Sequence, residues 1–330
     1  MTDIEKFGLG DRRGVHRGTI HVGLVNNMPD SALRATELQF ARLLKESAGA
    51  LDVQLHLFSL AAIERGEEAR SRMEGFYADA ETLPMAGIDA LIVTGAEPRA
   101  ANFQDEPYWE SLAHLIDWAE TATASTVFSC LAAHAAVFHL SGISRKPLPR
   151  KMSGIFTAAR VGGEDALQTG MQARIHVPHS RRNGLPESEL ARDGYRSLWR
   201  LDDSVDSFTK LMPGGSQFLF LQGHPEYGGD SLGREYLRDV GRFLRGESGE
   251  RPHVPENYFD RATEIALAGL DAESSQPGDL ARYSTLVSGA LPLQSWRGHT
   301  LKLFGNWLGV IAAEKLRRRN QAPERRKLRA

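Results

Sequence analysis

The chain has 330 residues, of which 41% are hydrophobic and 25% are charged, and its formal net charge is −2. This composition is typical of a soluble globular protein of one large or two modest domains, and the near-neutral charge gives no general reason to expect a nucleic-acid partner. Its apolar runs are too short to cross a bilayer, and the polar residues 1–6 are not typical of a signal peptide. The single cysteine excludes an intramolecular disulfide and is expected in a reducing cytoplasm.

Strands and helices are predicted to alternate over the first 140 residues. Strands are expected at 19–25, 53–58, 90–94 and 125–129, and helices at about 32–46, 61–82, 108–121 and 131–140. This alternation predicts an α/β fold with a doubly wound, mostly parallel sheet. Because active sites in such sheets lie at the carboxyl ends of the strands, segments 26–29 and 95–98 and Cys130 should meet at one edge.

The second half of the chain has a less regular pattern. Strands are predicted at 155–161, 173–177 and 218–221, a polar loop at 178–184, and helices at 230–245, 262–270 and 299–319. We therefore expect an N-terminal arm at 1–18 and a single α/β domain at 19–320, with an insertion-rich segment at 246–295 and C-terminal helical additions. The basic tail at 321–330 is interpreted as a solvated helix end rather than a nucleic-acid contact.

The segment 125–137 joins a predicted buried strand to a predicted helix, with Cys130 at the junction. A side chain at such a turn is held away from the backbone, and the helix start supplies unpaired N–H groups whose partial positive charge favours a thiolate. The flanking Ser129, Ala132 and Ala133 are small, as close packing at a sharp turn requires. Cys130 is therefore a candidate nucleophile, although a buried structural cysteine fits this local pattern about equally well.

A nucleophilic cysteine needs a base, and His224 is the candidate among the 11 histidines. It follows the predicted strand at 218–221, Pro225 stiffens its turn, and Glu226 can orient the imidazole and stabilise its charged form. For His224 alone, a His-Pro turn beside a surface glutamate is an equal alternative. The combination with Cys130 is more specific. The histidines are scattered and Cys130 has no partner thiol, so no metal site is expected.

Together these features resemble the class I glutamine amidotransferase-like fold, which is flavodoxin-like and carries a Cys-His-Glu triad. More closely, the chain resembles a divergent member of the homoserine O-acyltransferases of the MetA type. The matching stretches follow the family order over about residues 20–310. They are 22–29, 36–39, 91–96, 108–110, 129–136, 178–181, 223–227, 235–239, 255–259, Trp296 and 303–307.

The resemblance implies a ping-pong acyl transfer in methionine biosynthesis, with acyl-CoA as co-substrate and no bound cofactor. Cys130 would attack the thioester, and the hydroxyl of L-homoserine would then take the acyl group, with His224 as general base and Glu226 behind it. Backbone N–H groups near Leu131 would form the oxyanion hole. The resemblance also implies a homodimer acting on small molecules in the cytoplasm, without a membrane or nucleic-acid partner.

The resemblance further implies that Arg181 and Arg238 bind the amino-acid acceptor, with Ser180 in the same Pro-His-Ser-Arg motif as Arg181. A guanidinium clamp on an α-carboxylate is the expected chemistry. For each arginine considered alone, a surface ion pair is the alternative interpretation.

Departures from the family pattern leave the substrates open. The family usually has a lysine just after Met-Pro, where this chain has Asp30 and Ser31, and a glutamine where it has His134. L-serine, in cysteine biosynthesis, is an alternative acceptor, because one methylene gives only about 1–3 kcal/mol of discrimination. At a position that is Gly in many succinyl users and Glu in acetyl users, this chain has Arg99. A cation there could pair with the free carboxylate of succinyl-CoA, so succinyl is favoured over acetyl.

Two other classes of function compete with the acyltransferase. One is a glutaminase or related hydrolase on the same fold, and the other is a non-enzymatic relative that only binds a ligand or partner. Incubation with acyl-CoA followed by intact-mass measurement separates the three, because only the acyltransferase forms an adduct that is lost on Cys130→Ser substitution.

Overall fold

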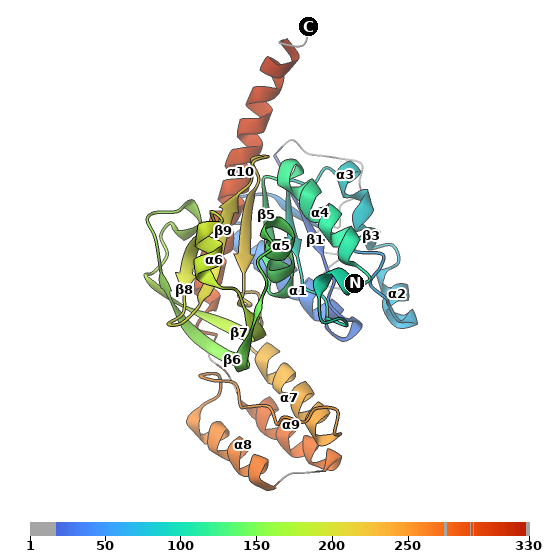
Figure 1. Ribbon diagram of the computed structural model, residues 1–330, viewed down its shortest axis with the longest axis vertical. Coiled ribbons are helices and arrows are strands. Elements are labelled where there is room, and N and C mark those ends of the chain that lie inside the picture. Colours follow the sequence, from blue (N-terminus) through green and yellow to red (C-terminus); the bar gives the residue numbers. More distant parts are fainter. Residues whose placement is uncertain (1–17, 274–275, 291, 293, 328–330) are drawn as a thin grey trace.

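The structure is a computed structural model that describes residues 18–273, 276–290, 292 and 294–327. Its described strands form one ten-stranded sheet with helices on both faces (Figure 1). Across the sheet the strands are β3 (Tyr77–Asp79), β2 (Val53–Ser59), β1 (Ile20–Val25), β4 (Ala90–Val93), β5 (Ser125–Ser129), β10 (Gln217–Leu221), β9 (Val205–Leu211), β8 (Arg196–Arg200), β6 (Lys146–Arg160) and β7 (Arg174–Gly184). The predicted N-terminal arm, apart from residue 18, and the last three residues of the predicted tail lie outside the described residues.

The sheet has a parallel half and an antiparallel half. The six strands from β3 to β10 pair in parallel, and the order of the first five confirms the predicted doubly wound α/β fold. The remaining strands, β9, β8, β6 and β7, pair antiparallel. Links such as 201–204 and 212–216 are too short for the crossover that parallel pairing requires, so they produce hairpins instead.

The described helices cover the sheet and also extend beyond it. They are α1 (Asp30–Ser47), α2 (Glu67–Met73), α3 (Leu83–Ala86), α4 (Trp109–Ala122), α5 (Leu131–Ser141), α6 (Glu187–Arg192), α7 (Ser231–Leu244), α8 (Arg261–Glu273), α9 (Leu280–Gly289) and α10 (Arg297–Lys327). Beyond the sheet, α10 extends at the top of the view in Figure 1 and α7 to α9 at the bottom. Short 3-10 segments lie at Ala80–Thr82, Phe103–Asp105, Ala166–Gln168 and Pro277–Asp279. Within the described residues, no helix is both long and apolar enough to cross a membrane.

Two predictions for individual elements are wrong. The single helix expected over 61–82 is only the short α2, because Gly75 adopts a left-handed φ of 79° and the chain then enters the edge strand β3. The polar loop expected at 178–184 is the second half of β7. There the backbone pairs with β6, although the side chains include Arg181 and other polar groups.

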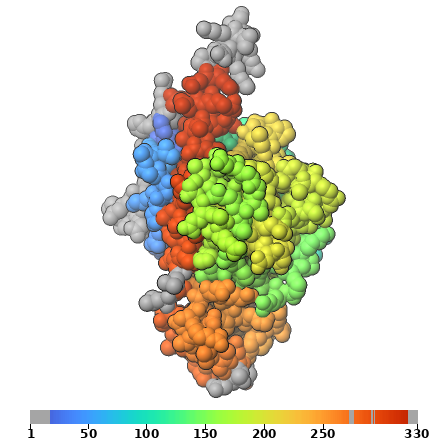
Figure 2. Space-filling model, turned by 90° about the vertical axis from the view of Figure 1, so that its left-hand side faces the viewer, coloured from blue at the N-terminus to red at the C-terminus, as the bar shows by residue number. Residues whose placement is uncertain are grey.

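Adjacent residues of the central strands enter two different cores. Phe128 of β5 packs with α4 and α5 on one face, whereas Val127 packs with α1 and α10 on the other. In Figure 2, α10 (red) runs between the N-terminal segments (blue) and the middle of the chain (green). The indole Nε1 of Trp307 on α10 donates to Ser125 Oγ at 2.9 Å, which fixes the helix to the sheet. A third core joins α7, α8 and α9 around the fully buried Tyr283 and Trp296.

Candidate active site

Cys130 stands alone between the end of β5 and the start of α5, as predicted. Its backbone has φ 51° and ψ −109°, and among the described non-glycine residues only Asn257 shares a positive φ. Such a conformation is strained for an L-residue and persists only where the surrounding structure imposes it. The Cys130 N–H donates to the Leu221 carbonyl at 2.7 Å, so the turn is tied to the end of the neighbouring strand β10.

The loop after β4 approaches this turn closely at its second residue, Gly95. A Cβ placed on Gly95 would lie 2.7 Å from Leu131 Cβ and 3.3 Å from the Leu131 amide nitrogen. In the described part of the chain, that amide has no hydrogen-bond acceptor. The residue that follows Cys130 therefore offers an unpaired N–H at the start of α5, the kind of donor that an oxyanion needs.

His224 and Glu226 follow β10 and face Cys130. The Nδ1 atom of His224 lies 2.9 Å from Glu226 Oε1, and His224 lines the same cavity as Cys130. Ser129 Oγ donates to the same Glu226 oxygen at 3.4 Å. The Tyr227 ring stacks on the imidazole with ring centroids 4.3 Å apart. The side chains of His224 and Glu226 are both buried. Cys130, His224 and Glu226 thus follow the ends of two adjacent strands, β5 and β10.

The protonation of His224 depends on its two partners. Burial acts to lower the pKa of His224, but the charge and hydrogen bond of Cys130, together with those of Glu226, raise this pKa well above its ordinary value. These two partners therefore favour the protonated form of the imidazole. A protonated imidazole beside the sulfur stabilises the thiolate, which is the nucleophilic form of cysteine.

A cavity of about 500 Å³ opens over Cys130. Its lining is rich in charged side chains of both signs. The cations are Arg145, Lys151, Arg181, Arg182, Arg238 and Arg242, and the carboxylates are Glu97, Glu226, Glu235, Asp239, Glu247 and Glu250. Ligands that carry both charges, such as an amino acid, are matched by such a lining.

Of the residues predicted to bind the acceptor, Ser180, Arg181 and Arg238 all line this cavity. The Arg181 guanidinium is buried, and its donors go to His179 Nδ1 at 3.3 Å and to the Asn183 carbonyl and the Ser204 hydroxyl. Burial lowers the pKa of Arg181, and no described carboxylate forms an ion pair with it. Arg181 thus holds a positive charge close to Cys130.

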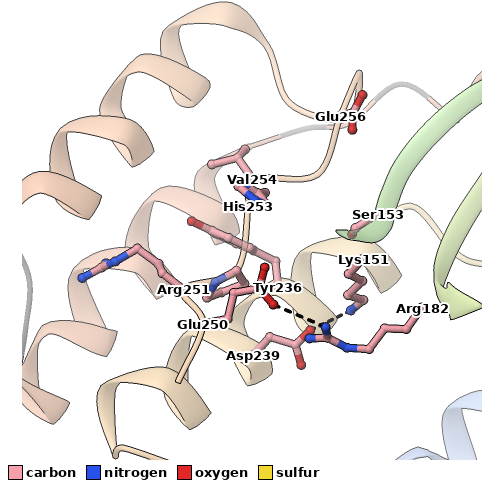
Figure 3. Close-up of a pocket in the computed structure, with 11 residues that line it drawn as sticks. Lys151, Ser153, Arg182, Tyr236, Asp239, Glu250, Arg251, His253, Val254 and Glu256 are labelled. Carbon is pink, nitrogen blue, oxygen red and sulfur yellow. Dashed lines mark hydrogen bonds and ion pairs between the residues drawn. The ribbon is translucent and has the colours of Figure 1, made fainter. Parts of the chain in front are cut away.

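A smaller recess adjoins the cavity at its rim (Figure 3). Two of the cations are already paired there: Lys151 Nζ lies 2.6 Å from Asp239, and Arg182 lies 3.6 Å from Glu250. Arg238 shares Asp239 at 2.9 Å and is about half exposed. These side chains form a neutralised rim between α7, β6 and β7.

Arg99 does not line the Cys130 cavity. Its guanidinium is mostly exposed, pairs with Glu64 at 2.6 Å, and faces a neighbouring cavity of about 540 Å³. The two cavities share Ser31, where the family lysine is missing, together with the loop at 96–98. The structure thus brings together the other predicted site residues but leaves Arg99 apart from them.

Sequence reasoning missed Glu235 and Arg145. Glu235 lies on α7 one turn before Arg238; one of its carboxylate oxygens accepts from the Tyr227 hydroxyl at 2.7 Å, and the other is buried with no described partner. The i, i+3 spacing of an acid and a base on a predicted helix would have indicated Glu235. Arg145 follows α5 in no recognisable motif. In the described residues, no cluster of His, Cys, Asp and Glu could hold a metal ion.

Comparisons with known proteins agree with this geometry. A family model described as homoserine O-succinyltransferase matches residues 13–316. The homoserine O-succinyltransferase of Rhodopseudomonas palustris is 48% identical, over 92% of this chain and 91% of that protein. The one from Bradyrhizobium japonicum is 45% identical, over 92% and 93%. A solved glutamine amidotransferase from Methylobacillus flagellatus is 14% identical over 89% of this chain and 95% of that chain, with a TM-score of 0.48. The chain belongs to the homoserine O-succinyltransferase family.

Proposed function

We propose that this protein transfers a succinyl group from succinyl-CoA to the side-chain hydroxyl of L-homoserine, in methionine biosynthesis. The observation that carries the proposal is the strained Cys130 beside the His224–Glu226 pair, at the base of a charged cavity, in a chain of this family. The reaction runs in two half-reactions through a thioester on Cys130.

In the first half-reaction the Cys130 thiolate attacks the thioester carbonyl of succinyl-CoA. The carbonyl oxygen becomes an oxyanion, and the Leu131 N–H is the donor beside it. When the tetrahedral intermediate collapses, the bond to the CoA sulfur breaks and His224 gives its proton to the departing sulfur. The Cys130 sulfur is left uncharged in a succinyl thioester, and the His224 imidazole is left neutral.

In the second half-reaction His224 acts as the base. The charge of Cys130, which raises the pKa of His224 in the free enzyme, is absent from the acyl-enzyme. The pKa of His224 therefore falls when the base is needed. The imidazole takes the proton of the homoserine hydroxyl, whose oxygen attacks the thioester carbonyl, and the Cys130 thiolate leaves. Glu226 stabilises the imidazolium that forms.

Arg238 and Glu235 are suited to the two charges of the amino-acid acceptor. They lie one turn apart on α7 and both line the cavity. The guanidinium of Arg238 can hold the α-carboxylate, and the unpartnered oxygen of Glu235 can accept from the α-ammonium group. The buried Arg181 adds positive charge near the reacting atoms, and Ser180 adds a hydroxyl.

We also propose that the enzyme acts in the cytoplasm as a homodimer. The motif resemblance supports the dimer, and the single cysteine and the CoA-dependent reaction support the compartment. Light scattering coupled to size-exclusion chromatography measures the mass in solution. A mass of one chain at micromolar concentration would contradict the dimer.

A matrix of donors and acceptors tests the function. Succinyl-CoA and acetyl-CoA are each assayed with L-homoserine and L-serine, and CoA release is followed. We expect the highest kcat/KM for succinyl-CoA with homoserine. Without acceptor, we expect the mass of one succinyl group on the intact protein and none on Cys130→Ser. Serine as the better acceptor, or glutamine hydrolysis without any acyl adduct, would overturn the proposal.

A further inference from the structure

Among the described residues, two cations that line the Cys130 cavity form no ion pair with an acid, namely Arg145 and Arg181. Arg182, Arg238 and Arg242 form ion pairs with Glu250, Asp239 and Glu97, respectively, and Lys151 shares Asp239. Arg181 has no such partner, but three of its five N–H groups are directed to protein acceptors. Arg145 differs from all of these, because in the described part of the chain its guanidinium has neither an ion-pair partner nor a hydrogen-bond acceptor.

Arg145 is held in place by an aromatic ring. Its guanidinium carbon lies 4.5 Å from the ring centroid of Phe103, which itself packs against Trp109 and Phe138. Stacking of this kind fixes the plane of a guanidinium and leaves its N–H edge open. The side chain is half-buried and lines the Cys130 cavity.

Arg145 and Cys130 line the same cavity. Against the effect of burial, the charges of Glu106 and Cys130 raise the pKa of Arg145. The charge of Arg145 in turn helps to lower the pKa of His134, which lies one turn after Leu131 on α5. Glu106 lies beyond ion-pair distance, and one of its oxygens already accepts from the Arg99 and Ala100 amides. Burial lowers the pKa of Arg145, so an anion that replaces its lost hydration would stabilise it.

We propose that Arg145 binds the distal carboxylate of the succinyl group, in succinyl-CoA and in the thioester on Cys130, and thereby sets the preference for a dicarboxylic acyl donor. This assignment rests on the proposed function. Two methylene groups separate the succinyl carboxylate from the thioester carbonyl, so the carboxylate stays within the chamber that holds Cys130. A guanidinium with an open edge receives a carboxylate in two parallel hydrogen bonds.

Arg145 thereby takes the role that the sequence comparison suggested for Arg99, which is to pair with the free carboxylate of succinyl-CoA. Arg99 lies in the neighbouring cavity and is paired with Glu64, whereas Arg145 lines the chamber of the nucleophile. Arg238 lies with Glu235 on α7, which suits the acceptor. The two substrate carboxylates would thus be held by different guanidinium groups on different elements.

The test compares succinyl-CoA with butyryl-CoA, which has a chain of the same length without the carboxylate. Arg145→Gln should lower kcat/KM for succinyl-CoA by about 30-fold or more, as expected when one member of a buried charge pair is removed. It should leave kcat/KM for butyryl-CoA and KM for homoserine unchanged. Arg145→Lys should restore part of the succinyl-CoA rate. The matched control is Arg150→Gln, an exposed arginine on β6 paired with Glu256, which should behave as wild type.

Three outcomes would overturn the proposal. An equal loss with both donors would mean that Arg145 binds the CoA moiety or supports the fold. An unchanged succinyl-CoA rate in Arg145→Gln, or a selective loss in Arg99→Gln instead, would assign the carboxylate elsewhere. Failure of the proposed function is separately visible, because wild-type protein would then form no acyl-Cys130 with either donor.

Discussion

Gly95 offers a sharp test of the oxyanion hole. In Gly95→Ala the new Cβ would lie 2.7 Å from Leu131 Cβ, whereas ordinary contacts begin at 3.4 Å, so the two segments must separate by about 0.7 Å. An oxyanion donor works at about 2.7–3.1 Å, and an added 0.7 Å takes an N–H beyond hydrogen-bonding distance. We expect kcat to fall by about 10²–10³-fold, the cost of losing one such donor.

Three measurements separate this effect from a general loss of structure. The kcat with succinyl-CoA and homoserine gives the main effect, and chemical denaturation should show a cost of about 1–3 kcal/mol from overpacking. Alkylation of Cys130 by iodoacetamide passes through no oxyanion, so its rate should stay near that of wild type. Gly163→Ala is the control, because a Cβ there meets no atom within 4 Å. A folded Gly95→Ala enzyme within about threefold of the wild-type kcat would refute the reasoning.

Three further predictions concern buried titratable groups. Burial lowers the pKa of His134 to about 4, below the 6.5 of an unfolded histidine. The free energy of unfolding should therefore be constant above about pH 6.5 and fall by about 3 kcal/mol as the pH is lowered to 4. In His134→Gln, denaturant unfolding should not show this loss at acidic pH. Glu226→Gln removes a charge that raises the pKa of His224, so kcat should fall by about 10²–10⁴-fold and the pH profile of deacylation should shift to lower pH; an unshifted profile would contradict the triad. Glu235→Gln should raise KM for homoserine by about 10–100-fold while the pre-steady-state burst of CoA stays intact, and loss of the burst would count against its role in acceptor binding.

The parallel half of the fold could be predicted from sequence because its strands are buried on both faces. Continuous apolar runs such as 90–94 then identify strands directly, and residues that follow them fall at one edge. The sequence alone therefore predicts that Cys130 and His224 each follow a buried strand and lie at the same edge of the sheet. Such a prediction is strongest where local sequence and tertiary environment agree.

The strand at 178–184 and the position of Arg145 could not be predicted in the same way. Strand β7 lines the cavity with polar residues such as Ser180 and Arg181, so the alternation that marks a strand is lost. Arg145 depends on Phe103, which is distant in sequence, to hold its side chain. Arg99 aligns with the family position that differs between succinyl and acetyl users. Its ion pair with Glu64 shows that alignment of a residue does not determine where its long side chain points.

The hydrogen bond from the Cys130 N–H to the Leu221 carbonyl has a consequence for how this enzyme can change. Cys130 and His224 follow two strands, β5 and β10, that are hydrogen-bonded to each other. The distance between the sulfur and the imidazole is therefore set by the pairing of these strands rather than by the helices and loops around them. The elements that we propose to bind the substrates, α7 and the turn that carries Arg145, lie outside these two strands. Mutation can therefore exchange donor or acceptor preference while the reaction machinery keeps its alignment.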